Sequence, residues 1–326
     1  MVCSEFTEDT KSINQLSKFW MIKFKAIFVF AIFSIVFFAC NSDANKTPTD
    51  KYNSGVINIS ADESFKPIID EQVKVYEAKY PNVKLLLHYK PESDCIKDMA
   101  DTNTRAVIIT RKFSNDEERF MLDSMKVVPT QMVMAYDAIA IIVNRDAEDS
   151  LFTVEELKNI LKGKFKKKLI PVFDGVKATS TVRFIVDSLL RGDSLNQNVR
   201  AANSSEDVIE YVAKTTNAIG FIGVSWIGNK DDLQQRSFLT KVRLAKLESN
   251  DLPGKFIHPV QANIYEGRYP LTRQLVFVLK ENYKDGLGHG FKNFVSGELG
   301  QLIFRRAYLV PAQMQFEVRH ATMREE

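Results

Sequence analysis

The sequence predicts a mostly parallel α/β fold. From Gly55 onward, short runs rich in β-branched residues alternate with amphipathic helical segments, as they do in parallel sheets covered by helices. A serine or threonine followed three positions later by an acidic residue marks the start of several helices. About 270 residues follow Gly55, which is enough to bury a large core, and we expect that core to be divided between two lobes.

The first half of this region predicts five strands and three helices. The longest helix carries Ile69, Val73 and Tyr76 on one face, and another begins at the capping box formed by Ser114 and Glu117. The expected strands are 56–59, 83–89, 106–110, 127–134 and 138–143, and the expected helices are 65–80, 93–100 and 114–125.

The second half continues the alternation. One helix is expected to begin at Thr153, with Glu156 three positions later completing its cap. Another is expected to begin at Ser204, followed by Asp207. The expected strands are 170–173, 218–222 and 275–279, and the expected helices are 153–163, 182–190, 204–212, 291–295 and 299–304. The polar segment 226–250 interrupts this pattern, and we interpret it as an irregular surface insertion with a β-rich piece at 238–244.

The amino-terminal forty residues differ from the rest of the chain. A short basic segment, 21–25, precedes an apolar run of about fourteen residues that ends at Cys40, too short for a membrane span. This pattern resembles the signal sequence and lipobox of bacterial lipoproteins. We therefore expect 1–40 to be a signal sequence with Met21 as the true start and a lipid on Cys40, the alternative being an uncleaved signal anchor. Residues 41–54 are polar and predict a flexible tether.

Composition argues against several functional classes. Lys and Arg number 44 and Asp and Glu 41, and this small net charge of +3 gives no case for a nucleic-acid partner. Outside the amino-terminal segment Cys95 is the only cysteine, so no intrachain disulfide is expected. The four histidines show no zinc-binding pattern, and no phosphate-binding P-loop sequence occurs. We therefore expect a binding protein with no cofactor or metal rather than an enzyme.

One strand-to-helix turn has the composition of an anion site. It places Thr179, Ser180 and Thr181 at the start of a helix, with Arg183 in its first turn. Unpaired N–H groups at a helix start, hydroxyl donors and a guanidinium fork together match the oxygens of a tetrahedral anion. The alternative interpretation is a plain helix cap with no ligand.

Two further turns carry a hydroxyl at a helix start. These are Ser64 with Phe65, and Ser93 with Asp94. Ligands of open α/β sheets bind at the carboxyl ends of the strands, so the three turns are expected to converge on one crevice.

Several short motifs occur in the order that one family shows, and together they span about 57–311. The sequence resembles the PstS-like substrate-binding proteins of phosphate ABC importers, which have the type II periplasmic binding fold. The motifs are 60–65, Thr110 to Phe113 with Glu117, 178–184, 218–222, 269–273, Gly300 with Gln301, and Val310 with Pro311.

The resemblance implies two lobes that close on an anion. Lobe one would comprise 55–137 and 266–320, and lobe two 138–265. The implied function is capture of inorganic phosphate, or a related oxyanion, by a monomeric lipoprotein that delivers it to an ABC permease. Its expected location is the cell envelope, either periplasmic or anchored to the outer membrane. The implied ligand-binding residues are Ser64, the N–H of Phe65, Ser93 and Arg111 from lobe one, and Thr179, Ser180, Thr181 and Arg183 from lobe two.

The sequence departs from the family pattern at two points. The 60–65 and 178–184 turns lack the family's glycines, and Arg111 stands where some phosphate binders have a carboxylate that accepts the phosphate proton. Either Arg111 or Arg183 is alternatively a salt-bridge residue. An envelope lipoprotein that keeps the fold for a structural or sensing role is therefore the alternative function, and a phosphatase is a weaker one. The remaining candidates for the proton acceptor are Asp62, Glu63, Glu92 and Asp94.

Overall fold

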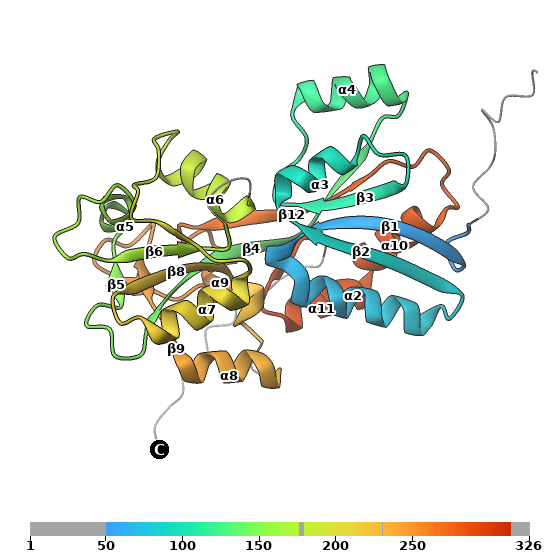
Figure 1. Cartoon of the computed structure of the whole chain (residues 1–326). Coiled ribbons are helices and arrows are strands. Elements are labelled where there is room, and N and C mark those ends of the chain that lie inside the picture. The colour runs from blue at the N-terminus through green and yellow to red at the C-terminus, as the bar shows by residue number, and fades with distance from the viewer. Residues whose placement is uncertain (1–49, 176–178, 230, 314–326) are drawn as a thin grey trace, which may run out of the picture. The chain divides into compact units, whose positions relative to one another are not determined.

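The computed structural model describes residues 50–175, 179–229 and 231–313 (Figure 1). The predicted signal sequence, the lipidation site Cys40, most of the tether and Ala178 of the oxyanion turn lie outside the described residues. Asp50, which the sequence assigns to the tether, is buried and forms an ion pair with Arg105 at 2.8 Å.

The first part of the fold contains three parallel strands and the helices that connect them. Its elements are β1 (Gly55–Asp62), the 3-10 turn η1 (Glu63–Phe65), α2 (Lys66–Lys79), β2 (Val83–Lys90), α3 (Glu92–Asp98), β3 (Thr104–Ile109), α4 (Asn115–Met125) and the long strand β4 (Thr130–Asn144).

The remaining elements build a second sheet region and then return to the first. They are β5 (Leu151–Phe152), α5 (Val154–Leu161), β6 (Ile170–Phe173), α6 (Ser180–Phe184), the π-helical turn η2 (Ile185–Leu189), β7 (Arg200–Ala201), α7 (Ser205–Lys214), β8 (Ala218–Gly223), the 3-10 turn η3 (Val224–Trp226), α8 (Leu233–Lys241), β9 (Val242–Leu244), β10 (Lys246–Glu248), β11 (Phe256–Ile257), α9 (Gln261–Tyr265), β12 (Thr272–Leu279), α10 (Leu287–Ser296), α11 (Glu298–Arg306) and β13 (Val310–Pro311).

The large sheet has the strand order β2-β1-β3-β12-β4-β8-β6-β7. Strands β2, β1 and β3 run parallel, as do β8, β6 and β7, whereas β12 and β4 pair antiparallel with their neighbours. Helices connect the parallel strands, because strands that run parallel need a crossover connection. The predicted α/β fold class is confirmed.

Two strands join the two halves of this sheet. The first part of β4, up to Ala138, pairs with β12, and the segment from Ile139 to Val143 pairs with β8. Figure 1 shows β4 and β12 running between the two groups of strands. Separate sets of buried apolar side chains fill each half, one around Tyr76 and the other around Phe173.

The helix starts confirm the local predictions. Ser114 and Thr153 each accept a hydrogen bond from the backbone N–H three residues on, and the Glu side chain at that position accepts one from the N–H of the cap residue. The Ser204 side chain caps α7 by accepting the N–H of Asp207. Capping chemistry depends on four consecutive residues, which is why the sequence alone locates it.

Two predictions were wrong. The strands expected at 127–134 and 138–143 are one strand, β4, because the polar break at Tyr136 and Asp137 lies opposite β12, where Arg273 neutralises Asp137. The segment 226–250 contains α8, β9 and β10, and of the β-rich piece expected at 238–244, residues 238–241 lie in α8 whereas 242–244 form β9 as expected. Asp232 caps that helix, and its buried Phe238 packs in a separate apolar cluster with Ile142 and Val208.

Candidate functional site

The site is built where β1 and β6 end. Ser64 follows β1, and Ser180 and Thr181 open α6 after β6. The Ser64 hydroxyl lies 3.5 Å from that of Ser180 and 3.4 Å from that of Thr181, and all three residues are fully buried. Residues more than a hundred positions apart therefore bring three hydroxyls together. We call Ser64, Ser180 and Thr181 the hydroxyl cluster.

A buried guanidinium completes one side of the hydroxyl cluster. Arg273 donates from Nη1 to Ser180 Oγ at 3.0 Å and to Thr181 Oγ1 at 3.4 Å. Its Nε donates to Asp137 Oδ2 at 2.9 Å, and its guanidinium lies 4.8 Å from the ring centre of Phe65. Arg273 Nη2 has no acceptor in the part of the chain that the structure describes. The buried Arg273–Asp137 pair thus keeps one unsatisfied nitrogen and one unsatisfied oxygen, Asp137 Oδ1, among the described residues.

The absence of a side chain at Gly223 allows Arg273 and the Ser64 backbone to approach the end of β8. A Cβ at Gly223 would lie 3.1 Å from both Arg273 Nη2 and the Ser64 carbonyl oxygen. That carbonyl already accepts hydrogen bonds from Ser225 Oγ and Trp226 Nε1. The end of β8 therefore fixes the backbone of Ser64 by close approach.

A carboxylate occupies the other side of the hydroxyl cluster. Asp174 Oδ2 accepts from Ser64 Oγ at 3.1 Å and from Thr181 Oγ1 at 3.4 Å. Burial raises the pKa of Asp174, although the charge of Arg273 and hydrogen bonds from Ser64 and Thr179 oppose the rise. The hydroxyls thus bind an anionic group that belongs to the protein.

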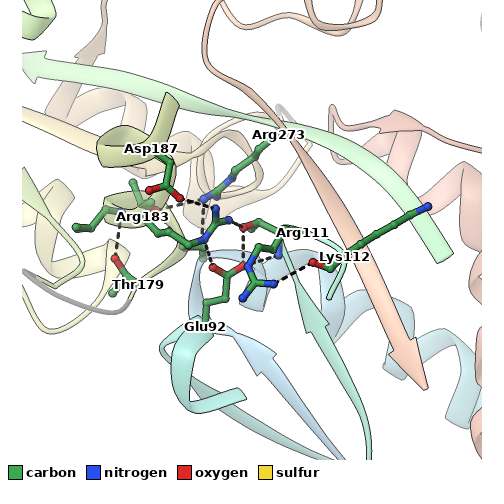
Figure 2. Close-up of polar contacts among 12 residues, drawn as sticks. Glu92, Arg111, Lys112, Thr179, Arg183, Asp187 and Arg273 are labelled. Carbon is green, nitrogen blue, oxygen red and sulfur yellow. Dashed lines mark hydrogen bonds and ion pairs between the residues drawn. The ribbon is translucent and has the colours of Figure 1, made fainter. Parts of the chain in front are cut away.

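Arg183 is likewise bound to an internal carboxylate (Figure 2). Its Nε donates to Glu92 Oε2 at 2.5 Å, and its Nη2 donates to Thr110 Oγ1 at 2.6 Å. The other Glu92 oxygen accepts from the N–H and hydroxyl of Thr110 at 2.8 and 2.6 Å. Burial alone would raise the pKa of Glu92, but these hydrogen bonds and the Arg183 charge outweigh it and hold the pKa below its usual value.

The other two predicted residues, Arg111 and Ser93, form no hydrogen bond with the hydroxyl cluster or with Glu92 in the described part of the chain. Arg111 forms two hydrogen bonds of 2.7 Å with Glu117 and one with the Lys112 carbonyl, as Figure 2 shows in part. Its pKa is raised chiefly by the Glu117 hydrogen bond, with a smaller contribution from the charge of Glu92. Ser93 is half-buried in α3 and contacts none of the hydroxyl cluster. Phe65 is buried beneath Arg273, and Thr179 caps α6.

A cavity of about 140 Å³ adjoins Asp174, and we call it the carboxyl cavity. Burial, together with the charges of Asp174 and Glu92, raises the pKa of Asp62 to about 6. Burial and the charge of Asp174 raise the pKa of Glu63 to about 7. The residues that line it include Asp62, Glu63, Tyr89 and Lys90 from the first half of the fold and Asp174 and Asn203 from the second.

The sequence missed the partners of the predicted residues. Asp174 follows β6 directly, so its place at the carboxyl end of a strand was a usable signal. Arg273 belongs to a family motif, but nothing local indicated that it would reach Ser180. Glu92 was named only as one proton acceptor among four.

Comparison with known proteins assigns the fold to a family. Residues 44–298 match the family model described as the PBP superfamily domain. The chain belongs to this family. Among curated relatives, the phosphate-binding protein PstS of Pseudomonas aeruginosa is 22% identical over 281 residues, covering 79% of this chain and 83% of that protein. PstS of Borreliella burgdorferi is 21% identical over 264 residues, covering 76% and 87%.

Solved structures of family relatives share the fold. A phosphate ABC transporter substrate-binding protein with bound phosphate from Clostridium perfringens aligns with a TM-score of 0.65 at 20% identity, covering 79% of this chain and all of that one. An ABC-type phosphate transport receptor from Vibrio cholerae aligns with a TM-score of 0.58 at 18% identity, covering 78% and 99%. The predicted resemblance to PstS-like binding proteins and the two-lobed fold are confirmed.

Two kinds of feature are absent from the described residues. Within 50–175, 179–229 and 231–313, no helix has both the length and the apolar character needed to cross a bilayer. In the same residues, no group of three or more His, Cys, Asp or Glu side chains is arranged to hold a metal ion.

Proposed function

We propose that this protein captures inorganic phosphate, or a related tetrahedral oxyanion, for an ABC importer. The observation that carries the proposal is the hydroxyl cluster, in which Ser64, Ser180 and Thr181 meet beside Arg273 within 3.0 to 3.5 Å. Such donors from both halves of the fold can satisfy several oxygens of one dehydrated anion. The PstS relatives support the same ligand class.

An entering anion must take donors from internal carboxylates. Asp174 uses the hydroxyl cluster and Glu92 uses Arg183, so an anion competes with one or both. A protonated Asp174 competes weakly, and the pKa values of the neighbouring Asp62 and Glu63 are also raised. We therefore expect phosphate affinity to increase as the pH falls from 8 to 5.5, since protonation removes negative charge from the cavity.

The same competition favours a second candidate function. If Glu92 and Asp174 permanently replace the ligand, the protein keeps the fold for a structural or sensing role without oxyanion transport. The specific observation is that each of the three guanidinium nitrogens of Arg183 already donates to a side chain in the part of the chain that the structure describes: Glu92, Asp187 and Thr110.

Isothermal titration calorimetry separates the two functions. The protein is titrated with phosphate, sulfate and molybdate at pH 5.5 and 8, together with Arg183→Ala and the surface control Arg268→Ala. We expect wild type and Arg268→Ala to bind phosphate, and Arg183→Ala to bind about 10–100-fold more weakly, because a hydrogen bond to a charged group contributes about 1.5–3 kcal/mol. Heat from no oxyanion at either pH supports the structural role, and turnover of a phosphomonoester would instead indicate a phosphatase.

Glu92→Gln sharpens this test. The amide keeps the shape of Glu92 and its acceptor for Thr110 but loses the charge that binds Arg183. If the anion uses Arg183, the variant binds phosphate more tightly than wild type. Equal affinity in both proteins places the anion elsewhere.

We also propose an extracytoplasmic, monomeric lipoprotein anchored through Cys40. The apolar run that ends at Cys40 and the polar segment after it support this proposal. Metabolic labelling with a fatty acid, compared between wild type and Cys40→Ala, tests the anchor. Labelling that persists in Cys40→Ala contradicts it.

A further inference from the structure

The carboxyl cavity brings three carboxyl groups together without a paired cation among the described residues. Asp62, Glu63 and Asp174 line it from both halves of the fold, and none of them forms an ion pair with a described residue. Glu63 is held by the N–H and hydroxyl of Ser205, both neutral donors. A buried carboxylate without a cation is costly, so three together need an explanation.

The nearby cations are bound elsewhere. Lys90 pairs with Asp98 at 2.7 Å, although it lines the cavity, and Arg273 pairs with Asp137 at 2.9 Å. Arg183 pairs with Glu92, the other charged group close to Asp62. Each cation therefore has its own carboxylate.

Two carboxyl oxygens at this cavity have no hydrogen-bond partner. Asp62 Oδ2 and Asp174 Oδ1 are both buried and lack a donor among the described residues, while the second oxygen of each carboxyl group is satisfied. Asp62 is 1% exposed and Asp174 9% exposed. Unsatisfied acceptors are rare in folded proteins, and here two of them belong to residues that line one small cavity.

We propose that the carboxyl cavity binds a primary ammonium group, which donates hydrogen bonds to Asp62 Oδ2 and Asp174 Oδ1. An ammonium carries the missing positive charge and three N–H donors, and it suits a cavity of about 140 Å³. A metal ion is not the assigned ligand, because no described group of three or more carboxylates is arranged to coordinate one. This site goes beyond the proposed oxyanion function and does not depend on it.

Two sources would present the same ammonium chemistry. One is a small free amine, and the other is an amine carried by a phosphate ester, whose phosphate would reach the adjoining hydroxyl cluster across Asp174 and Thr179. Methylammonium and phosphoethanolamine represent these sources in the experiment.

The test is calorimetric titration of the whole protein at pH 7 and constant ionic strength. The titrants are methylammonium chloride, phosphoethanolamine, tetramethylammonium chloride, calcium chloride and phosphate. We expect binding of methylammonium, phosphoethanolamine or both, and none of tetramethylammonium, which has no N–H donors. Binding of phosphoethanolamine without methylammonium assigns the ester only if phosphoethanolamine binds more tightly than phosphate, and equal affinity of the two contradicts the ammonium site. Failure of both amines, equal binding of tetramethylammonium, or binding of calcium instead would overturn the proposal.

Two variants and one linkage measurement complete the test. Asp62→Asn is expected to weaken amine binding at least tenfold, whereas Asp193→Asn, the same change on an exposed carboxylate, leaves it unchanged. Amine binding is expected to release protons, seen as a dependence of the heat on the buffer, because the cation favours ionised Asp62 and Glu63. Proton uptake, or unchanged binding in folded Asp62→Asn, contradicts the ammonium site.

The result is independent of the phosphate proposal. Amine binding without phosphate binding leaves the ammonium site standing and removes the oxyanion function. Phosphate binding without amine binding supports the oxyanion function and removes the ammonium site.

Discussion

Glu92 and Asp62 are both buried carboxyl groups at the junction of the two halves, but their environments differ. Glu92 accepts one hydrogen bond from the Arg183 guanidinium and two from Thr110, and its pKa is lowered. Asp62 receives one hydrogen bond from a backbone N–H and faces other carboxylates, and its pKa is raised to about 6. Burial is similar for both, so the partners decide which group stays charged.

The contrast indicates how the site divides its tasks. The Glu92 side is electrostatically complete and joins the two halves of the fold. The Asp62 side carries unpaired carboxyl groups and unsatisfied oxygens, so it is the part of the site that gains most from a ligand. Three substitutions test this difference.

Removing the guanidinium has the largest expected effect. Arg183→Met leaves Glu92 buried without its cation, and we expect the free energy of unfolding at pH 7 to fall by about 3 kcal/mol. Part of that loss returns at pH 5, because Glu92 without Arg183 protonates more readily. Urea denaturation at the two pH values measures both effects, and a loss below 1 kcal/mol at pH 7 would show that the pair contributes no more than a surface salt bridge.

Removing the carboxylate of Asp62 is expected to raise the free energy of unfolding rather than lower it. Asp62→Asn keeps an acceptor for the Ser64 N–H and deletes a charge with no cation, so we expect it to stabilise the protein by about 2 kcal/mol at pH 8. The two proteins should be nearly equal only below about pH 4, where Asp62 is protonated in both the folded and the unfolded state, and about half of the difference should remain at pH 5. Thermal unfolding across this range measures the difference, and destabilisation at pH 8 contradicts it.

The wild-type pH dependence follows from the same pKa values. The pKa values of Asp62 and Glu63 are raised to about 6 and about 7, so the folded protein binds more protons than the unfolded chain between about pH 4 and 7. Their contribution to stability is therefore largest at low pH and is lost as the pH rises through 6 and 7.

The smallest effect is expected at Arg111. Its pair with Glu117 is about 30% exposed on both sides and lies within one half of the fold, so Arg111→Met should cost about 1 kcal/mol or less. It is the matched control for Arg183→Met in the same denaturation series. Equal losses in both variants would remove the distinction between the two arginines.

Local features of the site could be predicted from the sequence. Thr179 was expected to cap a helix and does so, and Ser64, Ser180 and Thr181 were expected to face one place and lie together. Both expectations rest on strand ends and helix starts, which short segments specify.

The charged partners could not be predicted. Glu92 and Arg183 are 91 residues apart, and Ser180 and Arg273 are 93 apart. Which carboxylate meets which guanidinium depends on strand register and on the packing of two halves, and a single sequence does not specify either. The alternative interpretation of Arg111 and Arg183 as salt-bridge residues named the right interaction without naming the partners.

Arg273 and Asp137 lie opposite each other on the two strands that pass between the halves. A pivot moves least at its own axis. If the two halves rotate relative to each other about β4 and β12, the Arg273–Asp137 pair moves little. Arg183 on α6 lies farther from that axis and would separate from Glu92. Arg273 would then stay at the base of the cleft in the open and the closed state, whereas Arg183 would reach the site only when the two halves close.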